Sequence, residues 1–333
     1  MSLALIPVLW LGMVANAGCQ TKPNNNMTNN NNPLLCDPKK GACEIPATSE
    51  VTVQQNQGLK HTVRVIYFTD PICSSCWGIE PQLRKLKLEY GDAIEIEYRM
   101  GGLLPDWSYN SGGISKPSDV AHHWDEVSQY YDMPIDGDVW LEDPLDSSYP
   151  PSIAFKAAQM QDKKLAILFL RRIREMVFLE KKNITKWQHL SEAANQVGLD
   201  TAKLKSDYEH DAKQLFQADL SLARQFGVRG FPTLFFIDSL NNQQTVYGFR
   251  PYKSFEDAML KADAKANKKK YNTNWQQLFD VYPTLTTREF TELSGLTKTE
   301  GETLLQQLNS EKKINKLVTK NGVLWQVQLV LRK

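Results

Sequence analysis

The chain has 333 residues, with 39 Lys and Arg against 38 Asp and Glu, and a net charge of +1. This balance gives no overall electrostatic attraction to nucleic acid or to an anionic membrane. At 41% hydrophobic and 10% aromatic residues, the chain is too apolar to be disordered throughout. All five cysteines lie between residues 19 and 76, so the sequence does not indicate a fold stapled by many disulfides.

The N-terminal segment, residues 1–19, is predicted to be a signal peptide. It carries no charged side chain, most of its residues are apolar, and it ends in small residues before Cys19. This ending resembles a bacterial lipobox, which implies acylation of Cys19 and a lipid anchor in the membrane. A cleaved signal without a lipid and an uncleaved membrane anchor are the alternatives. Residues 20–58 follow as an asparagine-rich tether that cannot bury much surface.

Two further cysteines, Cys36 and Cys43, flank a turn signal inside this tether. We expect a small-loop disulfide between them if the segment lies outside the cell membrane. The alternative is that Cys36 and Cys43 form a second redox pair, which exchanges its disulfide with other thiols.

A buried strand and a helix are predicted at the start of a domain over residues 59–265. Residues 63–68 are β-branched and aromatic, and residues 79–90 carry apolar side chains at helical spacing. A turn between them leads into Cys73-Ser-Ser-Cys76. The sequence therefore places Cys73 at the N-terminus of a helix.

A helical insertion, about residues 115–226, interrupts the strands of this domain. Strands return at residues 233–237 and 244–247, and a helix follows near Phe255. This order of elements indicates an α/β, thioredoxin-like fold with a helical insertion. A strand is also predicted over residues 93–99, and helices over residues 164–180, 185–198 and 201–227.

The C-terminal segment, residues 272–333, is predicted to form a small winged-helix-like domain. Two helices, the first ended by Gly295, precede two strands joined by Asn321-Gly322, a dipeptide typical of a hairpin turn. Glu300 and Glu302 lie where a recognition helix would meet phosphates. We therefore expect no nucleic acid as a partner and favour an accessory or protein-interaction domain.

The pair Cys73 and Cys76 has a specific chemical use at the first turn of a helix. The unpaired N–H groups and partial positive charge of the helix N-terminus stabilise a thiolate on Cys73. That thiolate attacks a disulfide, and Cys76 then resolves the mixed disulfide. The alternatives are half of a zinc site, for which two further ligands are lacking nearby, and an inert structural pair. We predict no metal and no cofactor.

A second motif, Gly227-Val-Arg-Gly-Phe231-Pro232-Thr, stands immediately before the strand at residues 233–237. If the Phe231–Pro232 bond is cis, the resulting tight turn exposes the backbone of Phe231. That edge would pair with an extended substrate bound over Cys73. A trans bond at a plain strand boundary is the alternative.

Together the two motifs resemble the DsbA-like thioredoxin superfamily. Asp70-Pro-Ile-Cys73-Ser-Ser-Cys76-Trp is similar to its FrnE and YjbH (SpxH) branch, and the likeness covers about residues 59–265. The resemblance implies a catalytic pair at Cys73 and Cys76, a substrate-binding edge at Phe231 and Pro232, and an insertion that forms one wall of the cleft. Asp70 either relays a proton during disulfide exchange or caps the turn.

The favoured hypothesis is a thiol–disulfide oxidoreductase of the cell envelope that faces the periplasm or the exterior. Its partners would be protein thiols or disulfides, a redox partner, and a membrane reached through a lipid anchor at Cys19. The alternative is a cytoplasmic adaptor, because proteins of the YjbH type deliver a transcription regulator to a protease without redox turnover. Glutathione-dependent relatives of DsbA are disfavoured, since they usually carry Ser where Cys73 stands.

Overall fold

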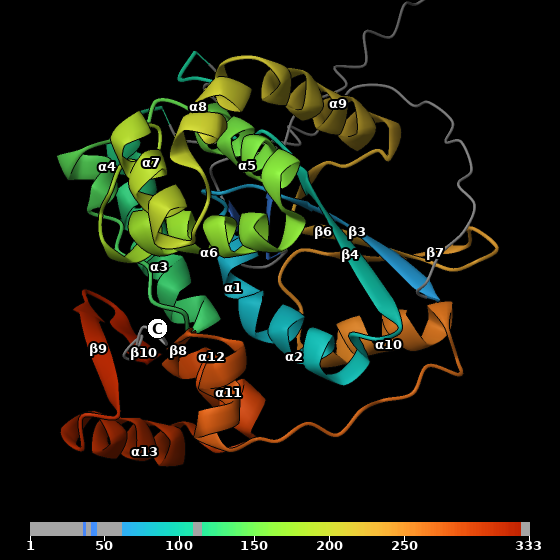
Figure 1. Ribbon diagram of the computed structural model, residues 1–333, viewed down its shortest axis with the longest axis vertical. Coiled ribbons are helices and arrows are strands. Elements are labelled where there is room, and N and C mark those ends of the chain that lie inside the picture. Colours follow the sequence, from blue (N-terminus) through green and yellow to red (C-terminus); the bar gives the residue numbers. More distant parts are fainter. Residues whose placement is uncertain (1–35, 38–40, 45–61, 109–114, 328–333) are drawn as a thin grey trace, which may run out of the picture.

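A four-stranded sheet forms the centre of the computed structural model, which describes residues 36–37, 41–44, 62–108 and 115–327 (Figure 1). The strand order is β4-β3-β6-β7, with β3 parallel to β4 and antiparallel to β6. β3 and β6 are largely buried on both faces, which accounts for their continuous apolar runs. The four strands are β3 (Val63–Thr69), β4 (Ile94–Met100), β6 (Thr233–Ile237) and β7 (Gln243–Tyr247).

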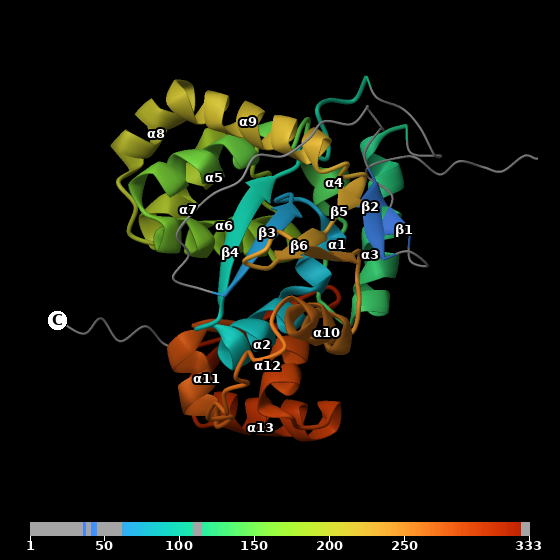
Figure 2. The ribbon, with the colours of Figure 1, turned by 90° about the vertical axis from the view of Figure 1, so that its right-hand side faces the viewer.

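Helices lie on both sides of this sheet. In Figure 2 the block formed by α5 to α9 lies to the upper left of the strands, and α2 and α10 lie below them. After β3 the chain forms α1 (Ser74–Gly78) and, beyond Ile79, α2 (Glu80–Tyr90). Pro81 is in the first turn of α2, where a missing N–H removes no helical hydrogen bond. The last helix of this domain is α10 (Tyr252–Ala262).

The predicted helical insertion is present between β4 and β6. The structure differs from the prediction at residues 201–227, where the expected single helix is broken at His210 into α8 and α9. The backbone of His210, at φ −121° and ψ −100°, is far from helical. The helices are α3 (Pro117–Tyr131), α4 (Val139–Glu142), α5 (Tyr149–Gln161), α6 (Lys163–Leu179), α7 (Trp187–Gln196), α8 (Thr201–Glu209) and α9 (Asp211–Gln225).

The C-terminal part of the chain forms a smaller unit around its own apolar core (Figure 1, lower left). The two predicted helices and the hairpin are present, and Gly295 ends the first helix with φ 75°. A further helix and a third strand, in the sheet order β8-β10-β9, were not predicted. The winged-helix-like assignment stays a prediction. The elements are α11 (Trp275–Val281), β8 (Thr284–Thr286), α12 (Thr287–Ser294), α13 (Lys298–Ser310), β9 (Ile314–Thr319) and β10 (Gly322–Val327).

Two short strands from the predicted tether lie beside the loop that contains Pro232. β1 (Cys36–Asp37) pairs antiparallel with β2 (Ala42–Glu44), with Cys36 opposite Cys43. β2 in turn pairs antiparallel with β5 (Gly230–Phe231). The Cys36/Cys43 segment within the predicted asparagine-rich tether therefore belongs to the fold.

Candidate functional site

Cys73 and Cys76 lie where the chain leaves β3 and enters α1. Cys73 is the N-cap of the helix, and its Sγ accepts a hydrogen bond from the backbone N–H of Cys76 at 3.2 Å. Both residues are thiols, and both have an exposed fraction of 0%. Their sulfur atoms are therefore inside the protein rather than on a surface that a substrate disulfide could reach.

The two thiols titrate in different surroundings. Burial raises the pKa of Cys73, and its hydrogen bond with Cys76 and the charge of Cys76 raise it further. Burial also disfavours the thiolate of Cys76, but the hydrogen bond with Cys73, the positive charge of Arg174 and the hydroxyl of Thr69 outweigh it and lower the pKa of Cys76. The surroundings thus favour a thiolate on Cys76, whereas the helix N-terminus alone favours Cys73.

Asp70 holds the turn between β3 and the cysteine pair. Its Oδ1 accepts a hydrogen bond from the N–H of Ile72, and its Oδ2 accepts from the N–H of Leu103 and the hydroxyl of Ser148. Burial raises the pKa of Asp70 to about 6, although these hydrogen bonds act in the opposite direction. The carboxyl group therefore joins the turn to the insertion.

Arg174, on α6, supplies the positive charge of the site. Its guanidinium donates to the hydroxyl of Thr69 at 2.6 Å, to the carbonyl of Asp70 at 3.2 Å and to Glu80 at 2.7 Å. Its side chain is only 1% exposed. Arg174 was not predicted from the sequence, because it lies 104 positions from Asp70 and stands in no local motif.

Aromatic side chains cover α1 from the insertion side. The hydroxyls of Ser75 and Tyr131 are hydrogen-bonded at 2.7 Å, and Phe249 packs on Tyr131 with ring centroids 4.8 Å apart. A Cβ at Gly78 would lie 2.7 Å from the Tyr131 ring, so glycine allows this close approach. The indole of Trp77 donates to the carbonyl of Pro134 at 3.0 Å. This packing leaves the cysteine helix in the protein core.

The loop before β6 has a cis peptide bond between Phe231 and Pro232. The Phe231 ring is buried against Gly101, where any Cβ would overlap it. The backbone of Phe231 is paired with β2, with Cys43 at the opposite register position. The edge that was predicted to receive a substrate is thus occupied by the chain itself. The substrate-binding role of Phe231 and Pro232 stays a prediction.

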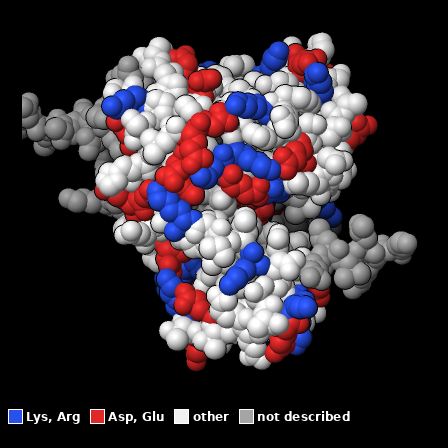
Figure 3. All heavy atoms as spheres, turned by 90° about the vertical axis from the view of Figure 1, so that its left-hand side faces the viewer, with Lys and Arg blue, Asp and Glu red and all other residues white. Residues whose placement is uncertain are grey.

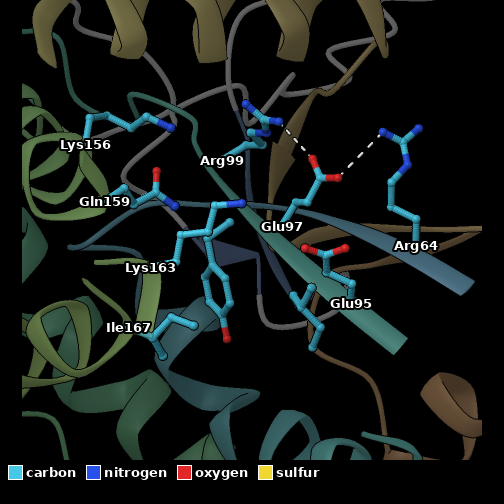
Figure 4. A pocket seen from close by; sticks show the side chains of 10 residues that line it. Arg64, Glu95, Glu97, Arg99, Lys156, Gln159, Lys163 and Ile167 are labelled. Atoms are coloured by element: carbon cyan, nitrogen blue, oxygen red, sulfur yellow. Dashed lines mark hydrogen bonds and ion pairs between the residues drawn. The ribbon is translucent and has the colours of Figure 1, made fainter. Parts of the chain in front are cut away.

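A hollow of about 330 Å³ lies elsewhere, beside strand β4 (Figure 4). It is lined by charges of both signs, among them Arg64 and Arg99, which both pair with Glu97, and Lys156, which pairs with the buried Asp219. None of the cysteine-pair residues lines it. Among the described residues, no group of three or more His, Cys, Asp or Glu side chains could hold a metal ion.

The surface charges are interleaved. Figure 3 shows acidic and basic side chains alternating over the face formed by the insertion and the C-terminal unit, without a basic field. Ion pairs between the described residues include Lys320 with Asp125 and Lys181 with Glu142. Such a surface does not concentrate nucleic acid.

The predictions for three further residues, Cys19, Cys36 and Cys43, are also untested by this geometry. Cys19 lies outside the described residues, so its predicted acylation has no structural counterpart. The register of β1 and β2 places Cys36 opposite Cys43, and their disulfide stays a prediction. In the part of the chain that the structure describes, no helix is both long and apolar enough to cross a membrane.

Comparison with known proteins gives one family and one set of full-length relatives. The family model for thioredoxin matches residues 67–257. The "ClpXP adapter protein SpxH" of Halalkalibacterium halodurans is 30% identical over 305 residues, which cover 90% of this chain and 99% of the relative. The protein of the same name from Bacillus subtilis is 28% identical and covers 80% of this chain and 89% of the relative.

A solved structure shares the fold of the central domain. It is named "Crystal structure of a putative protein disulfide isomerase from Nitrosomonas europaea". The TM-score is 0.52 at 21% identity, and the match covers 60% of this chain and 96% of that one. This likeness and the family match confirm the predicted thioredoxin-like fold, and the likeness says nothing further about activity.

These findings correct the predicted activity. The hypothesis of a thiol–disulfide oxidoreductase is wrong, because relatives that match along nearly their whole length are named as ClpXP adapter proteins. The predicted partners, namely thiol or disulfide substrates, a redox partner and a lipid-anchored membrane, are wrong for the same reason. The Cys73–Cys76 spacing does not by itself establish an activity, because the same fold supports different functions and both thiols are buried in this structure.

Proposed function

Since this chain belongs to the thioredoxin family and, within it, to the SpxH family, we propose that it is an adaptor that brings a client protein to the ClpXP protease. The observation that carries this proposal is the extent of the match with the relative from Halalkalibacterium halodurans. It covers 90% of this chain, so it must include much of both the central domain and the C-terminal unit. A match confined to the thioredoxin domain would cover a smaller share of this chain.

The buried cysteine pair agrees with an adaptor. An adaptor works by binding two proteins at once, which raises the effective concentration of one at the other. An adaptor therefore needs stable binding surfaces, and it does not need an exposed thiolate. In this chain Cys73 caps α1, and both thiols pack inside the core, which are structural tasks. We propose the cytoplasm as the location, where the protease and its client would meet, in place of the cell envelope.

The experiment that tests the proposal compares protein turnover in cells that carry this gene. Pulse-labelled proteins are followed in the wild type, in a strain without this chain, in a strain without ClpXP, and in the double deletion. We expect the same client to be stabilised to the same extent in all three mutants, because one adaptor and one protease act in series. Stabilisation that adds up in the double deletion, or no stabilised protein in the strain without this chain, would overturn the proposal.

A further inference from the structure

The strand edge at Gly230–Phe231 is paired with β2, a strand of the same chain. β5 is only two residues long, and β2 pairs with it in the register Cys43 opposite Phe231 and Glu44 opposite Gly230. β2 also lies against α1, the helix of the cysteine pair. A segment near the start of the chain is therefore inserted between the cis-proline loop and the cysteine helix.

Gly41 fixes this segment in place. Its backbone is left-handed, with φ 63°, and its carbonyl accepts a hydrogen bond from the N–H of Phe249. A Cβ at this position would lie 2.7 Å from the Cβ of Phe249 and 2.9 Å from its backbone N and O. Phe249 in turn packs on Tyr131, which is hydrogen-bonded to Ser75 of α1. The turn before β2 is thus fastened to the side chains that cover the cysteine helix.

The edge that β2 occupies accepts a strand through backbone hydrogen bonds. Such an edge pairs with any extended chain that reaches it, because the hydrogen bonds do not depend on side chains. It can hold one strand at a time. Since β2 belongs to the same chain, it meets the edge at a high effective concentration and excludes weaker competitors.

We propose that β2 is an internal ligand of the edge at Gly230–Phe231, which keeps this surface closed to extended segments of other proteins. The shortness of the pairing fits a removable cover: besides its contact with α1, β2 is held by two register pairs with β5 and one turn contact with Phe249, so it can open without unfolding the domain. A partner's extended segment takes the edge when β2 leaves. This proposal concerns the chain itself and does not depend on the adaptor function.

The test uses the full chain and a synthetic peptide as the probe. The peptide has the sequence of residues 36–46 with Ser in place of both cysteines and a fluorescent label. Gly41→Ala should release β2, because the new Cβ meets the backbone of Phe249. The matched control is Gly198→Ala, where the glycine also has a positive φ, 83°, but a Cβ would meet nothing within 4 Å. Ala42→Pro is a second way to release β2, since it removes a backbone N–H from the strand.

We expect the peptide to bind the Gly41→Ala chain roughly tenfold more tightly than the wild type or the Gly198→Ala chain, because the left-handed backbone alone costs a Cβ-bearing residue about that factor. Hydrogen exchange should be faster across residues 228–237 in Gly41→Ala and Ala42→Pro, and the peptide should slow it again. Equal peptide affinities in all four chains would overturn the proposal. So would unchanged exchange at residues 228–237 in both release variants.

Discussion

Burial changes the protonation equilibria of single residues around the cysteine pair. Asp70 is fully buried, and its carboxyl has a pKa of about 6 rather than the ordinary 3.8. Arg174 is buried as well and lies against Thr69, Asp70 and Glu80. The hydrogen bonds of Asp70 and Arg174 hold the turn before the cysteines in place. Because both side chains are buried, water has little access to them.

The raised pKa of Asp70 gives a pH dependence of stability. Between pH 3.8 and pH 6 the folded chain holds the proton that the unfolded chain has lost, so the free energy of unfolding falls as the pH rises through this window. The change from this one group is about 3 kcal/mol, from roughly two pKa units at ~1.4 kcal/mol each. Asp70→Asn removes the titration, so urea unfolding of the variant should lack this decrease.

Asp238 supplies the control for that measurement. Hydrogen bonds from Asn242 and from the N–H of Leu240 lower the pKa of its carboxyl, so its contribution has the opposite sign and is lost as the pH falls. Asp238→Asn should leave the decrease between pH 3.8 and pH 6 in place. A stability difference between wild type and Asp70→Asn that is the same at pH 3.5 and pH 7 would contradict the account.

Site residues that stand in a short sequence motif can be predicted from the sequence, and residues that stand in no such motif cannot. Cys73 at a helix start and Pro232 before a strand can be found because each stands in a short motif at an element boundary. Arg174 and Tyr131 could not be found, since they reach the site from helices that are 104 and 56 positions away from their partners. The burial of the cysteines, which separates a structural pair from a reactive one, depends on those distant residues.

Pairs of elements show how the C-terminal unit is attached to the central domain. Helix α12 begins at a capping box in which Glu289 accepts from the N–H of Thr286. The same carboxylate pairs with Arg171 of α6 through two hydrogen bonds and with Arg84 of α2. The guanidinium of Arg171 also lies 4.3 Å from the ring centroid of Trp77. One buried carboxylate therefore joins α12 to the helices around the cysteine pair.

Glu289→Gln tests this attachment. It removes the buried charge that Arg84 and Arg171 share, and breaking such a pair leaves an uncompensated charge, so we expect a loss of about 3 kcal/mol in the free energy of unfolding. Glu292→Gln is the matched control one turn further along α12. Glu292 pairs with Lys85 and Arg288 nearer the surface, with 14% of its side chain exposed, and should cost less than about 1 kcal/mol. Equal losses in the two variants would show that Glu289 does not hold the interface.

Helices and strands with a local sequence pattern can be predicted, whereas those that depend on distant partners cannot. Long apolar periodicity predicts α6, and Gly295 predicts the end of α12, because both signals are local. The three-residue strand β8 has no such signal and depends on its pairing with β10. β2 is extended because β5 offers it an edge, which no local pattern in the tether reveals.

At the scale of the whole molecule, the two units form one body. The β9–β10 turn contacts the insertion, where Asn321 donates to Asp125 and to the carbonyl of Ile135, and Lys320 pairs with Asp138. Together with the Glu289 contacts, this makes two separate points of attachment. We expect urea unfolding to show a single transition by both tryptophan fluorescence and circular dichroism. Two resolved transitions in the wild-type chain would mean that the units are independent.

The adaptor proposal rests on the long match with the SpxH relative, and the two attached units and the buried cysteine pair agree with it. The measurement that tests this most directly is degradation of the client by purified ClpXP, with and without this chain. We predict that the wild type accelerates degradation and that the Cys73→Ser, Cys76→Ser double variant does so equally, because serine keeps the cap of α1 while abolishing disulfide chemistry. A chain that fails to accelerate degradation, or one whose acceleration disappears in the folded double variant, would contradict the account.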